Sequence, residues 1–152
     1  MNQVILSPTH EQQNQLDDWL LASHTIFQDV IEMQNALKTR KWLRKRERKE
    51  MTAEFKKRHK LFNNVPKLLL TISITQGELC SRKVRGKYIR RAIQDEAFCT
   101  LPMSLVKLKD YSAKFKGIDG KIPYTEYDFD SIKSAILRRT SDKQYIIEVK
   151  YE

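Results

Sequence analysis

The residues most able to do chemistry in this chain are lysines and arginines, and the chemistry open to them is the binding of phosphate groups. The 152-residue sequence carries 29 of these bases against 19 acids, a net charge of +10. Residues 1–37 contain five acids and no base, whereas residues 38–121 contain 24 bases and eight acids, a net charge of +16. Residues 122–152 are nearly balanced, with five bases and six acids. A positive field confined to one stretch predicts a polyanionic partner, most often a nucleic acid.

Two tracts within the basic stretch are the densest in charge. In residues 39–60 the bases far outnumber three glutamates, and residues 82–91 contain no acid. Because a solvated helix face usually mixes the two signs, we expect both tracts to contact nucleic acid. A solvated or partly disordered arm is the alternative for residues 39–60. The bases expected at the interface are Arg40, Lys41, Arg44, Lys45, Arg48, Arg82, Lys83, Arg85, Lys87, Arg90 and Arg91, together with Lys107 and Lys109 further along.

The residue types that could support catalysis are scattered. Metal-dependent nucleases need two or three carboxylates that converge on Mg²⁺, and the cluster of Glu126, Asp128 and Asp130 is typical of an ordinary polar loop. The histidines lie far apart, and no nucleophile elbow or phosphate-binding loop is present in the sequence. Cys80 and Cys99 lack a CxxC spacing, which favours reduced, buried thiols. We therefore expect no enzymatic activity, no metal and no cofactor.

Size and hydropathy indicate the class of protein. The length suits one domain, or one domain with an insertion. No apolar run approaches the roughly 20 residues that span a membrane, and residues 1–6 lack the basic start of a signal peptide. We therefore expect a cytoplasmic protein that does not bind membranes.

Two helices are expected in the first part of the chain. Thr9 and Gln12 have capping-box spacing, and an apolar stripe with three- and four-residue spacing follows. Residues 39–60 predict a second helix with a thin apolar face, so that the first basic tract is exposed on it. The stripe of the first helix comprises Leu16, Trp19, Leu20, Ile26, Phe27, Val30 and Leu37.

A third helix is expected to begin at Pro66, a residue that suits the first helical turn. Gly77 and Gly86 weaken this helix, so we expect a kink or a break near one of them. The second basic tract lies at its far end. The apolar positions expected on this helix are Leu68, Leu69, Ile72, Leu79, Val84 and Ile89.

From about Met103 the apolar period changes to two, which predicts strands. Residues 104–109 and 111–116 alternate, and residues 117–120 have turn composition. Residues 131–139 and 144–151 predict a further strand pair.

The order of elements predicts an α+β fold. A short strand over residues 2–6 is expected to pair with the C-terminal strands. Residues 1–8 and 97–152 would then form a small antiparallel β-barrel, and residues 9–96 a three-helix insertion.

The sequence resembles the TnpB family of insertion-sequence RNA-guided nucleases, compact relatives of type V CRISPR effectors. Residues 6–12 (LSPTHEQ) resemble the family's opening motif, and Trp19 with the helix after it resembles its first recognition helix. Residues 64–67 (NVPK) resemble the step before a further helix of the family. The segments that resemble its final strands are residues 98–102, 121–123, 132–139 and 145–149.

The resemblance implies a fold and a function. In that family the corresponding region is a wedge-like barrel (WED) that holds a helical recognition insertion (REC). Together these parts bind the guide RNA scaffold and read a short motif beside the target DNA. The family's RuvC nuclease domain follows the last strand, whereas this sequence stops at Glu152. The resemblance therefore implies a module without catalytic carboxylates that partners a separate RuvC nuclease chain.

The resemblance also assigns two residues. The family presents a lysine after its VP step, and a polar residue four positions on, to the target-adjacent DNA motif. Lys67 and Thr71 occupy those places, and four-residue spacing puts both on one helical face. The family more often has glutamine at the second place, which bonds adenine through two atoms. Thr71 offers one hydroxyl bond and a methyl contact, and an ordinary polar helix residue is the alternative.

The leading expectation is a nucleic-acid-binding module of an RNA-guided DNA-targeting system, with guide RNA and target DNA as partners. Its bases would bind phosphates without reading sequence. Tyr111, Tyr124 or Trp42 could stack on a base, with core packing as the favoured alternative for Trp42. One alternative is a stand-alone DNA-binding regulator in which the second and third helices act as a helix-turn-helix-like reader. Another is an RNA-binding protein, or a protein that mimics part of an effector.

Overall fold

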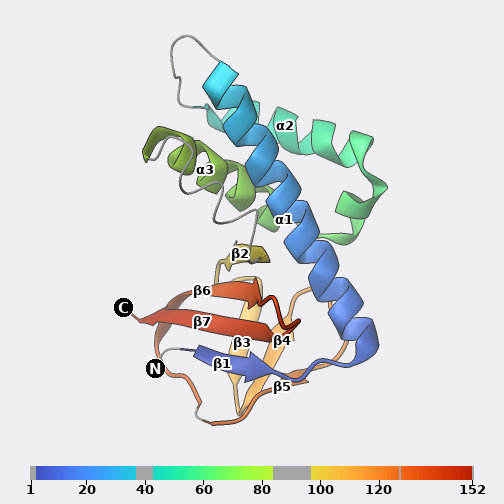
Figure 1. Cartoon of the computed structure of the whole chain (residues 1–152), viewed down its shortest axis with the longest axis vertical. Coiled ribbons are helices and arrows are strands. Elements are labelled where there is room, and N and C mark those ends of the chain that lie inside the picture. Colours follow the sequence, from blue (N-terminus) through green and yellow to red (C-terminus); the bar gives the residue numbers. More distant parts are fainter. Residues whose placement is uncertain (1–2, 37–42, 84–96, 127, 152) are drawn as a thin grey trace.

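A computed structural model describes residues 3–36, 43–83, 97–126 and 128–151. The helices lie on one side of the sheets, and the first helix, α1 (His10–Ala36), reaches from the sheets to the far end of the helical part (Figure 1). None of the described helices is long and apolar enough to cross a membrane. The elements in order are β1 (Gln3–Leu6), α1 (His10–Ala36), α2 (Lys45–Arg58), the short 3-10 helix η1 (Lys60–Asn64), α3 (Lys67–Lys83), β2 (Ala97–Leu101), β3 (Val106–Lys109), β4 (Ser112–Phe115), β5 (Ile122–Pro123), β6 (Ile132–Arg139) and β7 (Tyr145–Tyr151).

The α+β class is confirmed, but the described strands form two antiparallel sheets rather than one closed barrel. One sheet has the order β1-β7-β6-β2 and the other β3-β4-β5. The N-terminal strand pairs with a C-terminal one as expected, with Val4 opposite Ile147. The two sheets meet through an isolated bridge between Leu6 and Tyr124. Because β5 has two residues and the bridge is single, the ladder is not completed between β5 and β1.

The start of α1 confirms the capping box. The Thr9 N–H donates to Gln12 Oε1 at 2.9 Å, and the Gln12 N–H donates to Thr9 Oγ1 at 3.2 Å. The Gln12 amide also donates to the Asp119 carbonyl at 2.9 Å. The cap therefore ties the first turn of α1 to the loop between β4 and β5.

The apolar stripe of α1 is buried from Leu16 to Val30, as its spacing predicted. Trp19 meets Phe115 of β4 edge to face, with ring centroids 5.6 Å apart. This geometry is favourable for an aromatic pair. The stripe therefore packs the helical part and both sheets around a main core, while Phe27 belongs to a small second cluster with Ile31. Leu37, the last expected member, lies outside the described residues.

Gly77 does not break α3, which continues to Lys83. A Cβ atom on Gly77 would lie 3.0 Å from the Phe27 carbonyl oxygen and 3.0 Å from Val30 Cβ. The glycine therefore permits the close approach of α1 and α3, and the break expected near one of the two glycines does not lie at Gly77. Gly86 lies outside the described residues.

The buried face of α3 is also shifted from the expected one. Leu69 is buried as expected, together with Leu70 and Ile74, whereas Leu68 is exposed and Ile72 is half-buried. The close contact of Gly77 with α1 determines which side of α3 faces the core. The apolar spacing within α3 could not predict this side, because the contact is made with another helix. The other expected positions, Leu79, Val84 and Ile89, have no described side chain.

Candidate nucleic-acid interface

A buried carboxylate holds the start of α2. Glu78 of α3 is fully buried and accepts the Leu43 N–H at 2.8 Å. The guanidinium of Arg48 lies 3.6 Å from the same carboxylate. Arg48 was expected to bind phosphate, and the structure turns it toward Glu78, with 27% of its side chain exposed. The main apolar anchor of α2 is Phe55, which packs against Phe62 of η1.

Around α2 the two charge signs separate onto different flanks. Successive residues of a helix are about 100° apart, which places five bases within an arc of about 120°. By the same geometry the three glutamates Glu47, Glu50 and Glu54 occupy the adjoining arc of about 60°, which begins about 20° beyond Lys57. The bases that make up this surface, called the α2 basic flank, are Lys45, Arg46, Lys49, Lys56 and Lys57.

The α2 basic flank faces away from the core. Lys45, Lys49 and Lys57 are exposed, and Lys56 is half-buried. Arg46 pairs with Glu50 at 3.2 Å, and both side chains are well exposed. Exposed pairs of this kind contribute little to stability. The flank is therefore available to an external anion.

Of the remaining bases expected at the interface in the two basic tracts, only Arg44 has a described side chain. Arg44 is exposed, and its backbone N–H donates to Glu47 Oε1 at 3.2 Å at the start of α2. Arg82 and Lys83 belong to the last turn of α3, and their side chains are not described. The other expected contacts lie outside the described residues; they are Arg40, Lys41, Arg85, Lys87, Arg90 and Arg91.

The outer face of the three-stranded sheet β3-β4-β5 carries a second set of bases. Lys107 and Lys109 of β3 are exposed while their neighbours Val106 and Leu108 are buried. Lys107 lies directly opposite Lys114 of β4, an arrangement of like charges that destabilises a sheet. The Lys114 ammonium donates to the Ile118 carbonyl at 2.8 Å, which offsets part of that cost. Lys107, Lys109 and Lys114 are called the lysine face below.

A groove lies between the start of α3 and the ends of the three-stranded sheet β3-β4-β5. Its volume is about 500 Å³, and it brings Lys67, at the start of α3, near Lys116, which follows β4. Asn63, Asn64 and Ser104 also line the groove. Sequence reasoning singled out Lys67 and missed these neighbours. Nothing in the local sequence around the two asparagines indicates that Lys116 lies near them.

Thr71 lies one turn after Lys67 and is half-buried. Its hydroxyl donates to the Lys67 carbonyl at 3.1 Å. A threonine bonded back to its own helix keeps an oxygen lone pair and a methyl group for external contacts. Thr71 is therefore placed to accept a hydrogen bond rather than to donate one.

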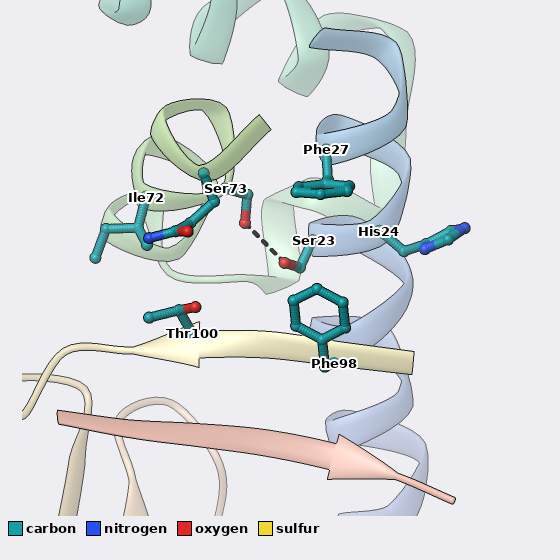
Figure 2. A pocket seen from close by; sticks show the side chains of 8 residues that line it. Ser23, His24, Phe27, Ile72, Ser73, Phe98 and Thr100 are labelled. Atoms are coloured by element: carbon teal, nitrogen blue, oxygen red, sulfur yellow. Dashed lines mark hydrogen bonds between the residues drawn. The ribbon is translucent and has the colours of Figure 1, made fainter. Parts of the chain in front are cut away.

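A smaller cavity lies between α1, α3 and β2 (Figure 2). Its volume is about 10 Å³, which is room for about one water molecule. The Ser73 hydroxyl donates to Ser23 Oγ at 2.8 Å, and the rings of Phe27 and Phe98 lie 6.0 Å apart. Burial lowers the pKa of His24 on its rim. This cavity is a packing feature of the helix crossing.

The acidic loop after β5 has a structural role that the sequence did not reveal. Asp128 Oδ1 accepts the Tyr124 hydroxyl at 2.6 Å and the Phe129 N–H at 3.0 Å. The bond from Tyr124 is the main reason that the pKa of Asp128 is lowered. Among the described residues, no group of three or more His, Cys, Asp and Glu side chains could hold a metal ion. Cys99 is a free, buried thiol whose pKa is raised by burial.

Comparison with known proteins adds no assignment. None of the known protein-family models matches the chain, and no curated protein matches it significantly.

Proposed function

We propose that this chain is a non-catalytic nucleic-acid-binding module whose α2 basic flank, lysine face and Lys67 contact the sugar-phosphate backbone. The observation that carries the proposal is the distribution of charge on α2, where five of the seven bases share one outward flank and the three glutamates gather in the adjoining arc. A helix stabilised by its own ion pairs would mix the signs on each flank. A flank of one sign repels itself, and a bound polyanion relieves that repulsion.

The TnpB-like features of the sequence extend the proposal. The sheets would correspond to the WED part and the helices to the REC part of an RNA-guided DNA-targeting system. The module would bind the guide RNA scaffold and target-adjacent DNA, and a separate RuvC nuclease subunit would cut. The groove beside Lys67 supports this extension, because two lysines and two asparagines there offer donors to both phosphates and base edges.

The test is to purify the chain from its native host and to sequence the nucleic acid that accompanies it. One structured RNA encoded near its gene would support the guided system. Duplex DNA without RNA would indicate a stand-alone DNA-binding regulator instead of a guided system. Bulk ribosomal RNA would indicate a general RNA-binding protein. If no nucleic acid accompanies the protein and none binds at low salt, the proposed function is wrong.

A further inference from the structure

Tyr111 occupies a backbone position that disfavours its side chain. Lys109 pairs with Ser112 across the β3–β4 hairpin, so Asp110 and Tyr111 alone make the turn. Their φ angles are +53° and +56°, the left-handed values of a type I′ turn. Glycine or asparagine is favoured at such positions, and a bulky side chain there is strained.

The surroundings hold this strained turn in place. The Asp128 carboxylate accepts the Tyr124 hydroxyl at 2.6 Å, and after that bond the backbone N–H groups of Phe129, Tyr111 and Asp110 also help to lower the pKa of Asp128. The Tyr124 N–H donates to the Tyr111 carbonyl at 3.0 Å. A strained residue that its surroundings over-determine is characteristic of functional sites.

Burial of the ring does not account for the strain. Tyr111 keeps 51% of its surface exposed, and its ring centroid is 6.3 Å from that of Tyr124. An exposed aromatic ring on a fixed backbone is a surface on which a nucleotide base can stack, whatever the base.

The charge around the hairpin defines how a strand would lie. Residues 104–123 contain five lysines and two acids, a net charge of +3. Beyond them, Glu126 and Asp130 are exposed on the acidic loop. We therefore expect the phosphates of a bound strand over the lysine face. Only a nucleotide base, without its phosphate, is expected at the tip of the hairpin.

We propose that Tyr111 is a stacking platform for an unpaired base of the bound nucleic acid. The inference rests on the proposed function and deepens it, since it specifies a single-stranded nucleotide at the tip of the β3–β4 hairpin. A tyrosine at a turn position where glycine would be less strained is the pattern expected of a residue that binds a ligand.

The test compares Tyr111→Gly and Tyr111→Phe with Tyr151→Ala, which removes another exposed tyrosine. Binding is measured to a labelled single-stranded oligouridylate and to a blunt RNA duplex. Tyr111→Gly should weaken single-strand binding about tenfold, leave duplex binding unchanged and not lower the unfolding midpoint, because glycine suits the turn. Tyr111→Phe keeps a ring and should bind like the wild type, as should Tyr151→Ala.

The outcomes separate this inference from the proposed function. If the wild type binds the single strand and Tyr111→Gly binds it equally well, the stacking platform is wrong while the proposed function stands. The same conclusion follows if Tyr111→Gly weakens single-strand and duplex binding equally. If the wild type binds neither probe at low salt, the proposed function itself fails.

Discussion

The helices α1 and α2 are neighbours in the chain and opposite in construction. α1 has 27 residues with five acids and no base, and its Leu16, Ile26 and Val30 are completely buried. α2 has 14 residues with seven bases and three acids, and it buries Thr52 and Phe55. The contrast shows that different helices provide the core and the positive surface. Substitutions in the two helices should therefore have separable effects.

The acids of α1 are directed partly toward the protein itself. Asp17 Oδ1 accepts Arg139 Nη1 at 3.2 Å and the Tyr145 hydroxyl at 2.7 Å. Burial, with the hydrogen bond to Asp17 as a second cause, raises the pKa of Tyr145 to about 12. α1 thus compensates a base of β6, whereas no such partner faces most of the α2 basic flank among the described residues.

The largest expected effect is a loss of stability when a buried side chain of α1 is removed. Trp19→Ala should lower the free energy of unfolding by about 3–5 kcal/mol, because it empties the contact with Phe115 in the core. The matched control is Leu21→Ala on the exposed side of the same helix, which should change stability by less than about 0.5 kcal/mol. Denaturant unfolding checks both. Equal effects of the two substitutions would contradict the assignment of α1 to the core.

The second-largest effect is expected at Glu78, where one substitution should change both stability and nucleic-acid binding. Glu78 belongs to α3 but holds both Leu43 and Arg48 at the start of α2. Glu78→Ala should cost about 2–3 kcal/mol, since it leaves buried donors without their acceptor. It should also weaken nucleic-acid binding, because the start of α2 loses its anchor. Glu54→Ala on α2 is the control, and chemical denaturation with a binding titration measures both. Unchanged stability in Glu78→Ala would contradict this role.

How much of this arrangement was predictable depends on how local its cause is. The capping box of Thr9 and Gln12 and the burial of Trp19 follow from spacing along the chain, and both are confirmed. The contact that Gly77 makes could not be predicted, because it depends on the approach of Val30 from another helix. The inward turn of Arg48 likewise depends on Glu78, thirty residues away, whose burial has no local signal.

The smallest expected effect concerns pH and the hairpin tip. The pKa of Asp128 is lowered in the folded protein, chiefly by the hydrogen bond from Tyr124. Its contribution to stability is therefore present above the unfolded carboxyl pKa of about 4 and is lost as the pH falls through the lowered value. Asp128→Asn should lower the unfolding midpoint at neutral pH, and the difference from wild type should vanish in acid. Asp130→Asn in the same loop serves as the control. A difference that persists below the folded pKa would refute this explanation.

The most direct test of the central claim removes charge from the α2 basic flank alone. Lys45→Gln, Lys49→Gln and Lys56→Gln are combined in one variant, and Lys133→Gln, Lys143→Gln and Lys150→Gln in a control with the same net charge. Affinity for a labelled B-form DNA duplex is measured against salt concentration. If α2 contacts the backbone, the slope of log affinity against log salt should become shallower by about 2–3 in the first variant. The control should keep the wild-type slope, and equal changes in both variants would show that net charge alone, rather than the α2 basic flank, governs binding.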